Sequence, residues 1–157
     1  MGDFVFNVAK GRVNELHERV NNNDPANSAL IVVLLKTAAA DATLIDQDDL
    51  AAILAGGSSE ADFTGYARKV LTDSDIVASA VDDTNNRREA DISDPTWDPA
   101  GGAANNTLAK LLICYDPDTT SGTDSTIVPL TAHDFVVTTN GGSISATVNA
   151  AGYYRAS

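Results

Sequence analysis

A run of seven consecutive apolar residues at positions 29–35 constrains the fold more than any other feature of the chain. The run has the length of a strand and is far too short to cross a bilayer as a helix. A strand without polar positions has no face to offer to solvent. We therefore expect residues 29–36 to form a central strand covered on both sides, and residues 108–115, which contain a second apolar run, to form another strand.

Two clusters of turn-forming residues predict hairpins. Residues 82–86 are rich in Asp and Asn, and residues 140–142 read Asn-Gly-Gly. Both compositions favour tight turns because Asn and Gly tolerate positive φ. The strands expected to flank these turns are residues 76–81 and 87–92 for the first hairpin, and residues 134–139 and 143–149 for the second.

Two further short strands are expected. Residues 66–72 carry a strand-like composition, and residues 126–130 form a brief apolar segment that contains Pro129. Because proline cannot donate a backbone hydrogen bond, Pro129 favours an edge strand or a bulge. Trp97 lies in an irregular segment and is expected to close one end of the core.

Helical spacing occurs in two places. Val13, Leu16 and Val20 recur at the period of a helix, although the same segment is also compatible with an edge strand. Residues 46–55 favour a short helix, with acids in its first turn and Gly56 directly after its last apolar residue.

These patterns predict a mainly-β single domain with one or two short helices, arranged as a β-sandwich or an open barrel. The chain has 157 residues, which fits one domain. Gly11 separates residues 1–10, an N-terminal strand or assembly arm, from residues 11–157, the β-rich domain.

Charge limits the partners of the chain. The chain has ten basic and 22 acidic residues, which gives a formal net charge of −12. Such a surface repels phosphate backbones, so we expect no nucleic-acid partner, and the short apolar runs predict no membrane segment. A single cysteine excludes a disulfide framework, and no secretory signal opens the chain, so we expect it to be made in a cytoplasm.

No arrangement of residues indicates catalysis or a bound cofactor. Cys114 sits in an apolar strand, where a buried and inert thiol is expected. His133 precedes Asp134, but neighbouring residues of a strand point to opposite faces and do not form a dyad. We therefore expect a protein that is not an enzyme, without catalytic or cofactor-binding residues.

One segment invites a metal hypothesis. Asp116, Asp118 and Asp124 place oxygen ligands in a polar loop, as calcium requires. The EF-hand pattern fails, because Ser121 and Ile127 occupy the positions of its glycine and glutamate. A looser calcium loop and a plain connection rich in turn formers both remain open, and the second is favoured.

Seven segments resemble a family of small virion structural proteins of tailed bacteriophages, especially those of actinobacteria. They cover most of the chain and consist of turn and strand residues, so they carry no catalytic signature. The segments are VAKGRV (8–13), NDPANSA (23–29), GYARKVLT (65–72), DDTN (82–85), CYDPDTT (114–120), PLTAHDF (129–135) and YYRAS (153–157).

The resemblance implies a virion protein whose partners are other virion proteins, the major capsid protein or tail proteins, and further copies of itself. Its first interpretation is a capsid decoration or stabilising protein on the head shell. The alternative is a tail-tip, fibre or baseplate component that contributes to host attachment. The residues expected to make assembly contacts are Phe4, Val5, Phe6, Tyr153 and Tyr154.

Overall fold

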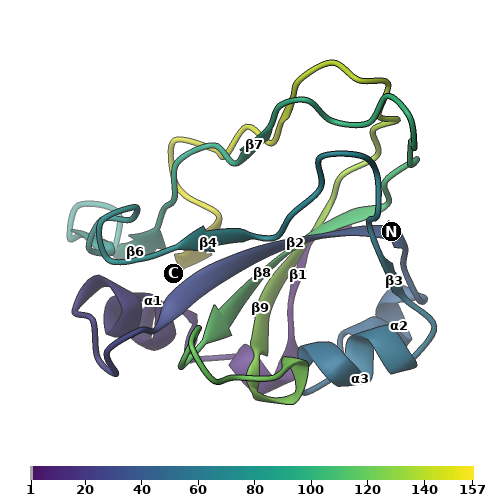
Figure 1. The fold of residues 1–157 in the computed structure, drawn as a ribbon. Helices are drawn as coiled ribbons and strands as arrows, with labels where there is room; N and C mark the ends of the chain where they lie inside the picture. Colours follow the sequence, from purple (N-terminus) through teal and green to yellow (C-terminus); the bar gives the residue numbers. More distant parts are fainter. Residues whose placement is uncertain (1) are drawn as a thin grey trace.

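The computed structural model describes residues 2–157 of the chain (Figure 1). Its main sheet consists of six antiparallel strands. The strand order is β1-β9-β8-β2-β3, and β4 pairs with another part of β2. The strands are β1 (Phe4–Val5), β2 (Ala29–Thr37), β3 (Ser59–Glu60), β4 (Lys69–Leu71), β8 (Lys110–Asp116) and β9 (Val128–Asp134).

The two longest apolar segments lie side by side at the centre of this sheet. β2 and β8 pair in register from Ala29 opposite Asp116 to Leu35 opposite Lys110. All residues of β8 and the first seven of β2 are buried. The predicted central strand is confirmed, and its uninterrupted apolar character reflects cover on both faces.

Three short helices pack around the sheet: α1 (Val13–Asn21), α2 (Asp41–Leu44) and α3 (Leu50–Ala55). Figure 1 shows α2 and α3 below the main sheet and the long segment that contains β7 above it. Leu44, Leu50 and Ile53 are fully buried, so the two small helices close the core on their side. Within residues 2–157, no helix has the length and apolar character needed to cross a membrane.

The helical interpretation of the segment around Val13 is confirmed, and the edge-strand alternative is wrong. Val13, Leu16 and Val20 are all buried on one side of α1. The second predicted helix is also present, but it begins at Leu50 rather than at residue 46. Asp49 is its N-cap, and the side chain of Asp49 accepts a hydrogen bond of 2.8 Å from the backbone N–H of Ala52.

Two small sheets complete the fold. The first predicted hairpin is confirmed, because β5 and β6 pair across the turn and Asn86 has φ of 51°. β11 adds to the other side of β6. A two-stranded sheet pairs β10 with β7. The strands are β5 (Ala80–Asp82), β6 (Arg87–Ala90), β7 (Thr96–Trp97), β10 (Ile144–Ser145) and β11 (Tyr154–Ala156).

The second predicted hairpin, with strands 134–139 and 143–149, is wrong. The turn at residues 140–142 exists, but its two flanks pair with other parts of the chain. Thr138 bridges Thr107, whereas Ile144 pairs with Trp97. The turn therefore forms here, although the segments on its two sides do not pair with each other as they would in a hairpin.

The expected short strand at residues 126–130 is also corrected. β9 begins at Val128 and continues to Asp134, and it lies between β1 and β8 instead of at an edge. Pro129 is tolerated because it faces Cys114 next to a register shift, as the bulge alternative predicted.

The predicted fold class is confirmed: the chain is a mainly-β single domain with short helices, and the sheet does not close into a barrel. In residues 1–10, Phe4 and Val5 pair with Ala132 and Thr131 of the same chain and form the outermost strand of the main sheet. Met1 lies outside the described residues.

A buried lysine joins the start of the chain to this core. The side chain of Lys110 is fully buried, and its Nζ lies 2.6 Å from Asp134 Oδ1 and 3.1 Å from Asp41 Oδ1. It also donates to the carbonyl oxygen of Gly2 at 3.1 Å and lies 5.3 Å from the centre of the Phe4 ring. A lysine inside an apolar strand requires such partners, because an unpaired buried charge is costly.

We expect Lys110→Met to lower the free energy of unfolding by about 2 to 4 kcal/mol, because it leaves two carboxylates without their cation. Urea unfolding followed by circular dichroism measures this loss. Lys36→Met is the matched control, since Lys36 pairs with a largely exposed Asp62 and should lose much less. Equal losses in the two variants would contradict the structural role of Lys110.

Candidate functional site

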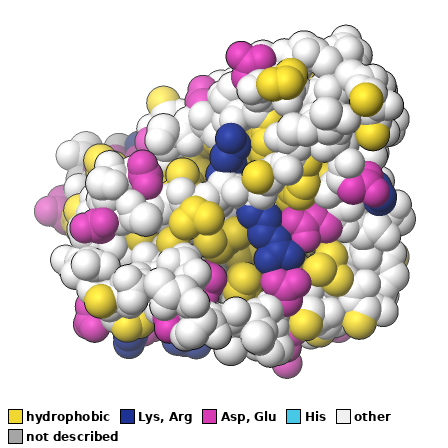
Figure 2. All heavy atoms as spheres, viewed as in Figure 1, with side chains coloured by type: hydrophobic (Ala, Val, Ile, Leu, Met, Phe, Trp, Pro, Cys, Tyr) yellow, Lys and Arg dark blue, Asp and Glu magenta, His cyan; other side chains and the backbone are white. Residues whose placement is uncertain are grey.

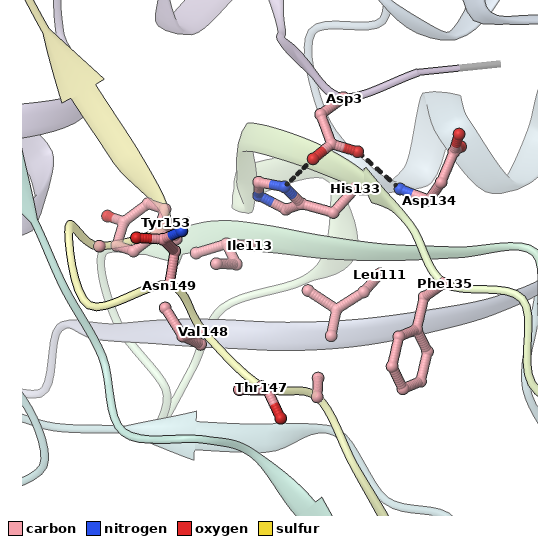
Figure 3. Close-up of a pocket in the computed structure, with 12 residues that line it drawn as sticks. Asp3, Leu111, Ile113, His133, Asp134, Phe135, Thr147, Val148, Asn149 and Tyr153 are labelled. Carbon is pink, nitrogen blue, oxygen red and sulfur yellow. Dashed lines mark hydrogen bonds and ion pairs between the residues drawn. The ribbon is translucent and has the colours of Figure 1, made fainter.

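A hollow of the described surface lies between the main sheet and the segment that precedes β11 (Figure 3). Its volume is about 350 Å³, at the lower end of the range of pockets that bind small molecules. Its lining residues are Asp3, Leu111, Ile113, His133, Asp134, Phe135, Ala146, Thr147, Val148, Asn149, Gly152 and Tyr153. We call this cavity the Asp3–His133 pocket.

Strand alternation builds the floor of the pocket. Leu111 and Ile113 are two positions apart on β8 and point to the same face of the sheet. His133 of β9 is paired with Leu111 and shares that face. Figure 3 shows the side chains of Leu111 and Ile113 pointing into the space between His133 and Val148.

The opposite wall comes from residues 146–149, which pass over the sheet in extended form. The backbone N–H of Ala146 donates to the carbonyl oxygen of Pro95 at 3.0 Å, and that of Val148 donates to Asp94 Oδ1 at 2.8 Å. Gly152 then turns the chain with φ of 85°, and a Cβ at this position would lie 2.1 Å from the carbonyl oxygen of Ala90. This turn brings Tyr153 into the wall of the pocket.

A carboxylate and an imidazole form the polar rim. His133 Nδ1 lies 3.2 Å from Asp3 Oδ2, and the backbone N–H of Asp134 donates to Asp3 Oδ1 at 2.9 Å. Partial burial acts to raise the pKa of Asp3, but the two hydrogen bonds and the nearby charge of Lys110 together outweigh it and hold the pKa below the usual 3.8. Asp3 is therefore ionised at neutral pH, and its side chain is 64% exposed.

His133 also contacts a hydroxyl, which gives the order carboxylate, imidazole and hydroxyl found in nucleophilic triads. Nε2 of His133 lies 2.9 Å from Thr131 Oγ1. Thr131, however, is only 2% exposed and sits in β9 between Val5 and Ile113, with no face open to a substrate. Nδ1 donates to the carboxylate of Asp3 and Nε2 contacts the hydroxyl of Thr131, so the two contacts fix the orientation of the ring.

Sequence reasoning missed the pairing of Asp3 with His133, because 130 positions separate them and no local pattern links them. It considered His133 only beside Asp134. That neighbour does point to the other face, where its carboxylate binds Lys110. The lysine within the apolar segment 108–115 was the one available signal that a carboxylate approaches this region.

The predicted assembly residues divide between this pocket and the core. Phe6 is fully buried, with its ring 5.3 Å from that of Phe4. Phe4 and Val5 are partly buried in β1, Tyr153 lines the pocket, and Tyr154 is partly buried in β11. Tyr153 and Asp3 thus line the same cavity, whereas Phe6 packs in the hydrophobic core.

His17, the second histidine, joins α1 to the segment around Tyr153. Its side chain is buried, Nε2 donates to the carbonyl oxygen of Val77 at 2.7 Å, and Nδ1 accepts from the Tyr153 hydroxyl at 3.2 Å. Burial lowers the pKa of His17 below 6.5 and outweighs the opposing contact with Val77. The ring is therefore neutral in the folded protein near neutral pH.

The free energy of unfolding should fall as the pH drops below about 6.5, because His17 binds a proton in the unfolded chain before it does so in the folded one. The slope should reach at most about 1.4 kcal/mol per pH unit and should flatten below the folded pKa. Urea unfolding between pH 5 and pH 7.5 measures it. His17→Gln should remove this slope, whereas a matched His133→Gln variant that also removes it would contradict the assignment.

Cys114 has no accessible chemistry in this fold. The residue is fully buried, and burial raises the pKa of its thiol to about 12. A thiol in this state is a weak nucleophile at neutral pH.

The three aspartates of the calcium hypothesis bind different partners. Asp116 Oδ1 accepts from the backbone N–H of Asp118 at 3.0 Å. Hydrogen bonds from Ser121 and Thr120 lower the pKa of Asp118 to about 2. Asp124 Oδ1 lies 2.6 Å from Arg68 Nη1. Within residues 2–157, no group of three or more His, Cys, Asp or Glu side chains is arranged to hold a metal ion.

The calcium hypothesis stays a prediction, and the contact between Asp124 and Arg68 indicates how it can be tested. Binding of one ion by all three aspartates would require Arg68 to release Asp124, so we expect excess Ca²⁺ to leave the melting temperature of chelator-treated protein unchanged. A native-state ligand must raise that temperature. A rise that Asp118→Asn abolishes would support the calcium loop.

Comparisons with known proteins identify no relative. No protein-family model, no curated protein and no solved structure matches this chain.

Proposed function

We propose that this chain is a non-enzymatic structural protein of a bacteriophage particle, bound in many copies as a decoration or stabilising protein on the head shell. The assignment to a phage particle rests on the resemblance of the seven sequence segments to phage virion proteins. The structure contributes the surfaces through which such a protein would dock.

The observation that carries the proposal is the exposure of apolar side chains on strands with a free edge. β4 pairs with β2 and β5 pairs with β6, and neither has a second neighbour within residues 2–157. Val70 of β4 is 48% exposed and Val81 of β5 is 65% exposed. Unpaired edges with apolar side chains are templates for contact with another chain.

Figure 2 shows the face on which β4 lies, where apolar side chains gather beside basic ones in an otherwise mixed surface. β1 offers another edge at the far side of the main sheet. Phe4 and Val5, the predicted assembly residues, form this strand. A neighbour that adds a strand here would use them as the sequence predicts.

The state of the reactive groups supports a non-enzymatic role. Cys114 and Thr131 are buried, and His17 is held between two hydrogen bonds inside the fold. The net charge of −12 supports a protein that stays dissolved at high concentration before it assembles. Symmetric docking of many copies, on the shell and on one another, follows from such a role.

Mass spectrometry of purified particles of the phage that encodes the chain tests the proposal. We expect a copy number that is a large fraction of that of the major capsid protein, because a decoration protein follows the symmetry of the shell. A handful of copies would favour the tail-tip, fibre or baseplate alternative, and a pull-down on host cell walls would then test attachment. Absence from purified particles would refute both.

A further inference from the structure

We infer that the Asp3–His133 pocket receives a single long basic side chain, lysine or arginine, presented by a partner protein. The aliphatic stem would lie on Leu111 and Ile113, and the cation would lie at the carboxylate of Asp3. The inference deepens the proposed function, on which it rests, by naming the chemistry of one contact.

The pocket has an apolar lining on which an aliphatic stem could lie. Its volume of about 350 Å³ suits one long side chain or a small molecule rather than a large cofactor. Leu111, Ile113 and Val148 point into it (Figure 3). Lysine and arginine combine such a stem with a charged head that stays near water.

The rim supplies a largely exposed carboxylate, that of Asp3, at one end of this apolar floor. Asp3 accepts hydrogen bonds from His133 and from the backbone of Asp134, and each carboxylate oxygen can accept another. No lysine or arginine is among the twelve lining residues. Asp134 differs, because its carboxylate is already paired with Lys110.

Charge complementarity selects this occupant over the alternatives. A negatively charged ligand would meet Asp3 and the acidic chain as a whole. A purely apolar ligand would cover the floor but would remove water from Asp3 without replacing its hydrogen bonds. A basic side chain satisfies both parts of the pocket at once.

Two small probes test the inference on the folded protein. Nα-acetyl-lysine-N-methylamide carries the stem and the cation, and Nα-acetyl-norleucine-N-methylamide carries a stem of the same length without charge. We expect the lysine probe to shift the methyl NMR signals of Leu111, Ile113 and Val148. It should bind about two- to fivefold more tightly than the norleucine probe, the range of an exposed ion pair.

Asp3→Asn should abolish the difference between the two probes. The new amide keeps an oxygen that can accept from the backbone N–H of Asp134, and an unchanged melting temperature would show that the fold is intact. Asp83→Asn is the matched control, because it removes one exposed charge away from the pocket and should preserve the preference for lysine.

Three results would overturn the inference: equal affinity of the two probes for the unmodified protein, no shift of the pocket methyl signals by either probe, or an equal loss in Asp3→Asn and Asp83→Asn. The comparison of probes on the unmodified protein needs no variant, so a misfolded Asp3→Asn leaves the test intact. Copy number in particles is a separate measurement, so failure of the proposed function is distinguishable from failure of this contact.

Discussion

The pairing of β2 with β8 is the interaction on which the rest of the structure depends. Fourteen residues in two buried strands face one another in seven consecutive pairs, from Ala29 opposite Asp116 to Leu35 opposite Lys110. Because neither strand has a solvent face, layers must cover both sides of the pair. The helices supply one cover, and the long segments that carry the small sheets supply another (Figure 1). The Asp3–His133 pocket forms where this second cover passes over Leu111 and Ile113 without filling the space.

The parts of the fold that could be predicted from sequence are those encoded by neighbouring residues. The apolar run before Lys36 indicates a central strand, the spacing of Val13, Leu16 and Val20 indicates a helix, and Asn86 indicates a turn. The hairpin expected at Asn140 failed because strand pairing is a long-range property. Its flanks found partners about 30 to 50 residues away, and a turn signal carries no information about such partners.

The candidate site was even less accessible to sequence reasoning. Tyr153 was singled out, but as an assembly residue and not as the wall of a pocket. Asp3 was passed over because its role depends on His133, which pairs with Leu111 in a strand that itself was misplaced. Chemistry that depends on the register of distant strands becomes visible only when the register is known. The calcium hypothesis shows the converse. Local spacing placed three oxygen ligands in one loop, whereas in the fold Asp124 forms an ion pair with Arg68.

The way in which the Asp3–His133 pocket is built has a consequence for folding. Its walls come from residue 3, from strands near residues 111 and 133, and from the turn at residue 152. Each of these contacts closes a long loop, which costs chain entropy that must be paid before the contact stabilises the fold. The pocket is therefore incomplete until the first and last strands have both docked. A partner that recognises the pocket would therefore bind finished copies of the chain in preference to partly folded ones.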